Sequence, residues 1–395
     1  MLAEGNVPSE FKTPGLKRTG EDTADAVAVV SGSELPEDDG LLAKVGLDPK
    51  RYAIDYSKGV RHKSWDALRR VRDAETDKVE TVKERMTGVQ FSVIERPVAV
   101  DLSDLESVVT AAPPVAPRCN VTEQTLLLAL GDLQLGKLEN SLEGVIARFN
   151  EGLEAAVLEA NTQKVDTIVI AWMGDCIEGF VSQNGANAWR TVLTLTEQLR
   201  IIRRLMLRAI DRFIDEGYTD IVAISVPGNH GDTIRVPVTT RSDDSFDTDA
   251  LVAVWETLEA NPARYGGKVS VVTPEVDEIG VVISIEGVST AFIHGHQFRP
   301  NQHWKWWEGQ SLGRTAYGEA DVLFTGHGHH TVIEERSERT FVMAPSLEER
   351  STWWVQRTGQ TGNPGVILAR FSDGEMVDVH KVTTRAGMKG ANDRG

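Results

Sequence analysis

Acidic, amide and imidazole side chains stand directly after several apolar runs of this sequence. Asp132 and Asp175 offer carboxylate oxygens, Asn229 offers a neutral carbonyl oxygen, and His327 and His329 offer imidazole nitrogens. Such a mixture of oxygen and nitrogen donors suits divalent transition-metal ions. The residue types therefore predict a metal site assembled from segments that lie far apart in the chain.

These donors belong to five short polar segments, and the fourth of them adds His294. The segments are ALGDLQ (129–134), MGDCIEG (173–179), VPGNHGD (226–232), FIHGHQF (292–298) and TGHGHH (325–330). Each follows an apolar stretch of strand length, namely residues 124–130, 166–173, 221–226, 290–293 and 321–324. Because ligands of open α/β sheets collect beyond the carboxyl ends of the strands, we expect the five loops to meet at one edge.

Taken singly, each segment has a simpler explanation. A Gly-Asp pair after a strand is often only a turn, and a solvated loop can be rich in histidine. Cys176, inside the second segment, is interpreted as a buried packing residue. The combination favours a metal site, because six of the nine histidines lie between His294 and His330, around the ends of two expected strands.

In type and order, these segments resemble the motifs of the calcineurin-like metallophosphoesterases. This superfamily includes purple acid phosphatases, cyclic-nucleotide phosphodiesterases and the nuclease subunit of the double-strand-break repair complex. The matching motifs GD, GDxxE, GNHxD, HGH and GHxH cover roughly residues 124–371. The resemblance implies an α/β domain in which two sheets pack face to face between helices, a four-layer αββα sandwich.

The resemblance also implies a site for two divalent metal ions, with Mn²⁺ favoured and Fe or Zn as alternatives. It assigns Asp175 to both ions and each other ligand to one ion: Asp132 and His329 to the first, and Asn229, His294 and His327 to the second. His296 and His330 are expected to lie nearby without binding metal.

Gln134 is the main departure from the family pattern. It stands where the family usually has a histidine, two residues after the first aspartate. An amide oxygen is a weaker ligand for zinc or iron than an imidazole. Gln134 is therefore a candidate ligand of the first ion, and a weak one.

Beside the ligand Asn229, His230 is the residue that the resemblance implies as the catalytic acid. It would hydrogen-bond the phosphate and protonate the leaving oxygen. Asp232 is expected to orient the ring of His230, because a carboxylate on one ring nitrogen fixes the tautomer. Glu178 is expected to support the site without binding metal.

The implied reaction is hydrolysis of a phosphate ester. Two ions about 3.5–4 Å apart can hold a hydroxide between them and stabilise the attacking and leaving oxygens. We expect a metal-dependent phosphodiesterase, above all a DNA nuclease, with a phosphomonoesterase or small-molecule phosphodiesterase as alternative. A different class is a non-catalytic binding scaffold whose first metal site is weakened by Gln134.

Two tryptophan-rich segments, 299–314 and 351–354, are candidates for substrate contact. Aromatic rings stack on nucleic-acid bases without sequence preference, at about 1–3 kcal/mol each. Trp304 and Trp307 would then border the metal pocket and contact DNA or a nucleotide, and Arg235 would contact a phosphate. The alternative is that these tryptophans pack their segment against the sheet.

Composition is typical of a soluble enzyme with more than one module: the 395 residues are 41% hydrophobic and 26% charged. No apolar run approaches the roughly 18 residues that span a bilayer, and the first residues lack an apolar segment for secretion. Two cysteines give no disulfide framework, so we expect a cytoplasmic protein without membrane contact. A net charge of −17 disfavours nucleic acid without excluding it, because bound metals supply local positive charge.

The chain is expected to divide near the proline-rich run 111–117. We predict a flexible tail (1–38), a small N-terminal α+β module (39–110), a linker (111–120), the metallophosphoesterase domain (121–385) and a second flexible tail (386–395). The module is expected to contain helices at 41–45 and 65–79 and a strand at 89–95. Its basic stretch 58–72 is a candidate surface for nucleic acid, a protein partner or a second copy, although a solvated helix face is the simpler explanation.

Apolar spacing predicts two core-facing helices in the larger domain, at 142–153 and 195–210. The acidic run 242–249 is expected to cap the helix that follows it. Further strands are expected at 269–272, 281–285, 331–335, 340–344 and 366–371.

Overall fold

The computed structural model divides the chain into two compact units, Met1–Ala99 and Val100–Gly395. It describes residues 15–18, 23–31, 36–47, 49, 52–54, 60–72, 79–95, 105–118, 122–181, 191–234, 240–349, 355, 359 and 362–386. Helix α2 (Leu105–Ala111), expected in the N-terminal module, belongs to the second unit. There, the side chain of Asn261 donates hydrogen bonds to the carbonyls of Val109 and Ala112, at 2.9 and 2.8 Å.

The first sheet of the second unit has the strand order β16-β15-β6-β7-β8-β9 in the described residues. Strands β6 (Gln124–Leu130), β7 (Thr167–Trp172), β8 (Asp220–Ser225) and β9 (Val269–Val272) are parallel neighbours. Strands β15 (Gly365–Ser372) and β16 (Glu375–Thr383) extend the sheet in antiparallel fashion. The crossover helices are α3 (Leu142–Gln163), α4 (Leu195–Asp215), α5 (Phe246–Leu258) and the short α6 (Pro262–Tyr265).

The second sheet has the order β10-β11-β12-β14-β13. Its strands are β10 (Gly280–Ile285), β11 (Val288–Ile293), β12 (Val322–Thr325), β13 (Val332–Arg336) and β14 (Arg339–Met343). Strands β11, β12 and β14 run parallel to their neighbours in that series, and β10 and β13 are antiparallel edges. Helices α7 (His303–Leu312) and α8 (Ala316–Glu319) connect β11 to β12.

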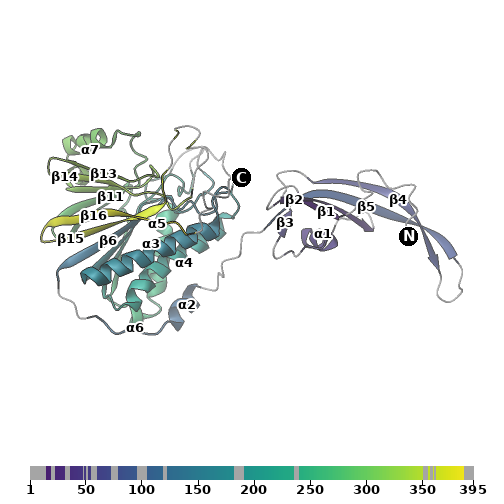
Figure 1. Ribbon diagram of the computed structural model, residues 1–395, viewed down its shortest axis with the longest axis horizontal. Helices are drawn as coiled ribbons and strands as arrows, with labels where there is room; N and C mark the ends of the chain where they lie inside the picture. Colours follow the sequence, from purple (N-terminus) through teal and green to yellow (C-terminus); the bar gives the residue numbers. More distant parts are fainter. Residues whose placement is uncertain are drawn as a thin grey trace. The chain divides into compact units, whose positions relative to one another are not determined.

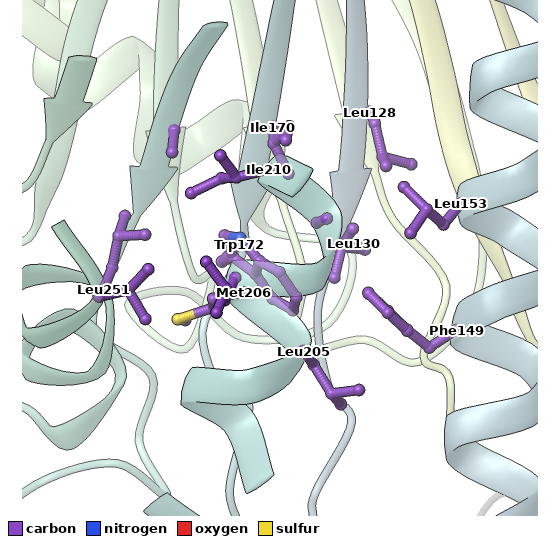
Figure 2. Close-up of a cluster of buried hydrophobic side chains, with 14 of the residues drawn as sticks. Leu128, Leu130, Phe149, Leu153, Ile170, Trp172, Leu205, Met206, Ile210 and Leu251 are labelled. Carbon is purple, nitrogen blue, oxygen red and sulfur yellow. The ribbon is translucent and has the colours of Figure 1, made fainter. Parts of the chain in front are cut away.

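Alternation along β6 shows how the layers stack. Leu126, Leu128 and Leu130 belong to the apolar cluster that packs against α3, α4 and α5 on one face. Figure 2 shows Leu128 and Leu130 in this cluster. Leu127 and Ala129 point to the opposite face and pack against the second sheet. The outer face of the second sheet is covered by α7 and α8, so the order of layers is helix, sheet, sheet, helix (Figure 1). The predicted four-layer sandwich is therefore what the described residues form.

The helices predicted at 142–153 and 195–210 are confirmed as parts of α3 and α4, which both extend farther. Ser141 caps α3 by accepting a hydrogen bond from the Gly144 backbone, and Thr194 and Glu197 form a reciprocal capping box at the start of α4. Ser245, within the acidic run expected to act as a cap, accepts from the Asp247 backbone at the start of α5. Among the described helices, none is both long enough and apolar enough to cross a membrane.

The first unit is a sheet on which α1 (Asp38–Lys44) packs. Its strands are β1 (Gly15–Arg18), β2 (Thr23–Ser31), β3 (Tyr52–Ile54), β4 (Arg61–Arg72) and β5 (Val79–Glu95). The long strand β5 pairs with β2, β3 and β4, in each case antiparallel. Apolar residues of β2, β3, β5 and α1 form a core of their own.

Two predictions for this unit are wrong. Residues 15–18 and 23–31, expected in a flexible tail, form β1 and β2, because Ala26, Ala28 and Val30 alternate and are buried on one face. The helix expected at 65–79 is instead strand β4 up to Arg72, since pairing along β5 outweighs the local helical spacing. The helix near 41–45 and the strand at 89–95 are confirmed as α1 and part of β5.

Candidate metal centre

The loops that follow β6, β7, β8, β11 and β12 meet at one edge of the two sheets, as predicted. Hydrogen bonds join them: the Asp132 backbone donates to the Gly174 carbonyl at 3.0 Å, and Gly326 donates to the His294 carbonyl at 2.8 Å. The His230 backbone donates to Oδ1 of Asp175 at 2.8 Å. Five segments remote in sequence are thereby fixed around one centre.

Several residues of these loops have a left-handed backbone. The φ angles are 50° at Asp132, 43° at Gln134, 49° at Asp175, 65° at His327 and 57° at His329. Non-glycine residues seldom adopt positive φ, and such strain, of order 1–3 kcal/mol per residue, clusters at functional sites. All five strained residues are predicted metal ligands, so the strain is where a functional site would place it.

Glycine is required where the second and third loops cross. A Cβ on Gly228 would lie 2.2 Å from both the backbone nitrogen and Oδ1 of Asp175. A Cβ on Gly174, whose φ is +82°, would lie 2.8 Å from the Cα of Gly228. Because neither position has room for a side chain, Asn229 and Asp175 come close together.

Asp175, His294 and His327 form a cluster that could hold a metal ion. Their potential ligand atoms all lie within 4.8 Å of one another. Nε2 of His294 lies 3.1 Å from Oδ2 of Asp175. Nδ1 of His294 donates to the Met173 carbonyl at 2.6 Å, and this second contact leaves Nε2 as the nitrogen that faces the site.

Buried atoms without hydrogen-bond partners mark the same place. Within the described residues, Oδ1 of Asp132, Oδ1 of Asn229 and Nε2 of His294 are buried and accept or donate no hydrogen bond. Leaving a buried polar atom unsatisfied costs about 1–3 kcal/mol. All three are atoms that the sequence predicts as metal ligands, Asp132 for the first ion and Asn229 and His294 for the second, and bound divalent cations would satisfy them. The residues present therefore fit a divalent metal ion.

The carboxylates also raise the pKa of two of the histidines. Burial disfavours the charged ring of His294, but the carboxylates of Asp175 and Asp132 outweigh burial and raise its pKa to about 9. For His329, burial is likewise outweighed by Asp132 and Glu348, which raise the pKa to about 10. The centre thus attracts positive charge, which metal ions can supply in place of protons.

At the first metal position, the structure shows contacts that the sequence did not predict. Nε2 of His329 lies 3.1 Å from Oδ1 of Asp132, while its Nδ1 lies 2.7 Å from Oε1 of the buried Glu348. Nζ of Lys137 contacts Oε2 of Glu348 at 2.6 Å and Oε1 of Gln134 at 2.7 Å. The amide oxygen of Gln134, a predicted ligand, is therefore engaged by an ammonium group.

His230 is held by Glu178 rather than by the predicted Asp232. Its Nδ1 lies 3.1 Å from the Glu178 carbonyl oxygen and 3.3 Å from Oε2 of the same residue. Its Nε2 lies 3.9 Å from Oδ2 of Asp175. Burial lowers the pKa of His230, but Asp175 and Glu178 outweigh burial and raise it to about 9. The contacts of Nδ1 with Glu178 leave Nε2 as the ring nitrogen that faces the centre.

Asp247 is a buried residue of the site that sequence reasoning missed. Its Oδ2 accepts from the backbones of Asp175 and Gly228, and its Oδ1 accepts from Cys176, each at 3.0 Å. Burial and the neighbouring Asp175 raise its pKa to about 6. The sequence predicts only a helix cap for the acidic run 242–249, whereas Asp247 fixes two metal loops to the first turn of α5.

Glu348 and Lys137 were also missed. Glu348 follows β14, as the predicted ligands follow their strands, so the same strand-end criterion applied to β14 would have found it. Lys137 lies three residues after Gln134. Nothing in its type or position in the sequence separates it from other surface lysines.

The predicted substrate tryptophans lie elsewhere. Trp304 and Trp307 are 7% and 1% exposed and pack beneath α7 against the second sheet. Their indole nitrogens donate to Glu334 and to the Tyr317 carbonyl, both at 2.7 Å. The substrate role is therefore wrong and the packing alternative correct. Arg235 and the segment 351–354 lie outside the described residues.

A cavity of about 200 Å³ adjoins the cluster and is lined in part by Asp232, Arg241 and His296. The exposed ring of His296 lies 5.5 Å from that of His294 and 6.2 Å from that of His327, measured between centroids. Asp232 thus borders open space next to the metal cluster.

Comparison with solved structures gives matches of low similarity. A conserved uncharacterized protein of Streptococcus pneumoniae, described as a predicted phosphoesterase, is 13% identical, with a TM-score of 0.28, over 67% of this chain and 91% of its own. Vacuolar protein sorting 29 of Cryptosporidium parvum is 15% identical, with a TM-score of 0.31, over 66% and 99%. A novel archaeal phosphodiesterase is 14% identical, with a TM-score of 0.30, over 65% and 99%. At such values none of the three assigns a function to this chain.

No protein-family model and no curated protein sequence matches the chain.

Proposed function

We propose that this protein hydrolyses phosphate esters with the help of divalent metal ions. The main support is that three of the converging loops carry buried atoms without a hydrogen-bond partner among the described residues, Oδ1 of Asp132, Oδ1 of Asn229 and Nε2 of His294, the last of them 3.1 Å from Oδ2 of Asp175. The motif resemblance to calcineurin-like metallophosphoesterases supplies the reaction class. Within that class we propose a phosphodiester substrate, which includes DNA, as the finer assignment.

Bound divalent ions would neutralise phosphoryl oxygens and activate a water molecule for attack. The carboxylate of Asp175 and the rings of His294 and His327 would hold an ion at the edge of the sheets. The cavity beside His296 offers room for the group attached to the phosphate.

His230 supplies the proton for the leaving group. As the bond between phosphorus and the leaving oxygen breaks, that oxygen takes the proton from Nε2 of His230. Glu178 accepts from Nδ1 and keeps the ring in the orientation that points Nε2 inward. Asp175 steers the same residue through its contact with the His230 backbone.

The test is hydrolysis of bis-p-nitrophenyl phosphate, p-nitrophenyl phosphate and labelled single- and double-stranded DNA, each with Mn²⁺. Wild type is compared with Asp175→Ala and His230→Ala, and with His380→Ala on the edge strand β16 as a histidine control. We expect diester turnover that is lost in Asp175→Ala, reduced about 10²–10⁴-fold in His230→Ala and kept in the control.

Each substrate arm decides a different part of the proposal. Turnover of the monoester alone would replace the diesterase assignment by a phosphomonoesterase, and uncut DNA would remove the nuclease. If metal-loaded protein turned over none of the substrates, a binding scaffold would be the better reading. That alternative is favoured by one observation, the engagement of Gln134 by Lys137 at the first position.

A further inference from the structure

The two metal positions differ in the donors that they offer. At the second position, Asp175, His294 and His327 have ligand atoms within 4.8 Å of one another. The motif resemblance assigns Asn229 to the same position, and its Oδ1 is buried without a hydrogen-bond partner among the described residues. A divalent ion at this position would have four candidate ligands, Asp175, Asn229, His294 and His327.

At the first position, the amide oxygen of Gln134 points toward Lys137 and not toward the other candidate ligands. Oε1 of Gln134 accepts a hydrogen bond from Nζ of Lys137 at 2.7 Å. The amide nitrogen of Gln134 then faces Nε2 of His329, at 3.5 Å. Because an ammonium group only donates, it selects the orientation in which the amide oxygen faces Lys137. The group left facing the metal side is an NH₂, which has no lone pair for a cation.

The lysine that causes this orientation is firmly held. Nζ of Lys137 also contacts Oε2 of Glu348 at 2.6 Å, and the side chains of Lys137 and Glu348 are 17% and 3% exposed. Glu348 in turn contacts Nδ1 of His329 at 2.7 Å. A network of three side chains thus fixes a positive charge next to the ligands of the first position. A charge so close to a second dication raises the electrostatic cost of binding it.

We propose that this protein holds one divalent ion tightly, at Asp175, Asn229, His294 and His327, and that Gln134 and Lys137 keep the first position weak. The inference rests on the proposed metal-dependent function and specifies its metal content. Next to the first position, the ammonium group of Lys137 supplies a positive charge that is held in place by Gln134 and Glu348.

The test counts metal ions without reference to activity. Full-length protein is loaded with Mn²⁺, separated from free metal by gel filtration and assayed for manganese, and Mn²⁺ binding is followed by electron paramagnetic resonance. We expect one Mn²⁺ per chain to be retained, with the six-line spectrum of an isolated ion. A second ion should bind at least about tenfold more weakly, a difference of about 1.4 kcal/mol.

Variants identify the residues responsible. Gln134→His with Lys137→Met returns an imidazole to the first position and removes the ammonium group at nearly unchanged side-chain length. This double variant should retain two ions and show the spectrum of a spin-coupled pair. Lys305→Met, at an exposed position of α7, is the matched lysine control and should retain one ion. Circular dichroism verifies that each variant is folded.

Ligand variants locate the retained ion. His294→Ala should lose it, whereas His329→Ala should keep it. The opposite pattern, or two equally tight ions in wild type, would overturn the inference. If wild type retained no ion at all, both the inference and the proposed function would fail. One retained ion without hydrolysis of any substrate would leave the inference standing and overturn the function alone.

Discussion

At the scale of single residues, the geometry of the centre depends on a carboxylate that is not itself a predicted ligand. Asp247 accepts three backbone hydrogen bonds, from Asp175, Cys176 and Gly228, and so fixes the loops after β7 and β8 to each other. A charged acceptor of several backbone amides holds them more firmly than a neutral one. Asp247 therefore acts on the metal through the residues that it positions.

Replacing Asp247 should weaken both folding and metal binding. Asp247→Ala leaves three buried amides without an acceptor, and each costs about 1–3 kcal/mol. Asp247→Asn keeps an oxygen for Asp175 and Gly228 and leaves only Cys176 unsatisfied, so it should lose about 1–3 kcal/mol. Urea unfolding and Mn²⁺ titration measure the two effects.

The control for this prediction is Asp249→Asn, two residues farther along α5. Asp249 is exposed and pairs with Arg203 at 2.8 Å, a surface contact that contributes at most about 1 kcal/mol. Equal stabilities of the Asp247 and Asp249 variants would show that the buried carboxylate does not fix the loops.

At the scale of elements, the sequence predicted the metal side of the fold well, because each buried strand there ends in a polar motif. Strand β6, for instance, begins and ends where its apolar run does. The prediction failed for residues 65–72, where a helix was expected and pairing with β5 makes strand β4 instead. The contact of Lys137 with Glu348 could not be predicted from the sequence, since it joins residues 211 positions apart.

Helix α7 shows why the tryptophans were assigned wrongly. Its apolar face seals the outer side of the second sheet, where the rings of Trp304 and Trp307 stack with centroids 5.3 Å apart. Arg336 and Arg339 lie over these rings, at 4.8 and 5.3 Å. Because Trp304 and Trp307 are close to His294 in sequence, a substrate surface was expected. In the fold, both rings lie on the outer face of the second sheet, whereas the inner face packs against the first sheet.

Trp307→Ala should accordingly lower stability without changing substrate binding. Removing this buried ring should cost about 3–5 kcal/mol. Below the melting temperature of the variant, KM for a phosphate ester should equal that of wild type. Trp255→Ala, at a position 42% exposed on α5, should change stability by less than about 0.5 kcal/mol. A raised KM for Trp307→Ala with unchanged stability would restore the substrate role.

At the scale of the whole molecule, the two units have separate cores. The first unit buries Phe91 and Leu42 in a cluster that contains only its own residues. Among the described residues, the clusters beneath and between the sheets of the second unit draw on residues from Leu105 onward. Every described ligand candidate belongs to the second unit, so metal binding should not require a folded first unit.

Phe91→Ala in the full-length chain tests this independence. The truncation should cost the first unit about 3–5 kcal/mol, which lowers one calorimetric transition while the other stays in place. Mn²⁺ retention and ester hydrolysis should persist at temperatures between the two transitions. Val82→Ala, on the same strand but 46% exposed, should move neither transition. If bound Mn²⁺ were lost when the first unit unfolds, the first unit would contribute to the metal centre. Two units with separate cores give no other reason for Mn²⁺ release and this unfolding to coincide.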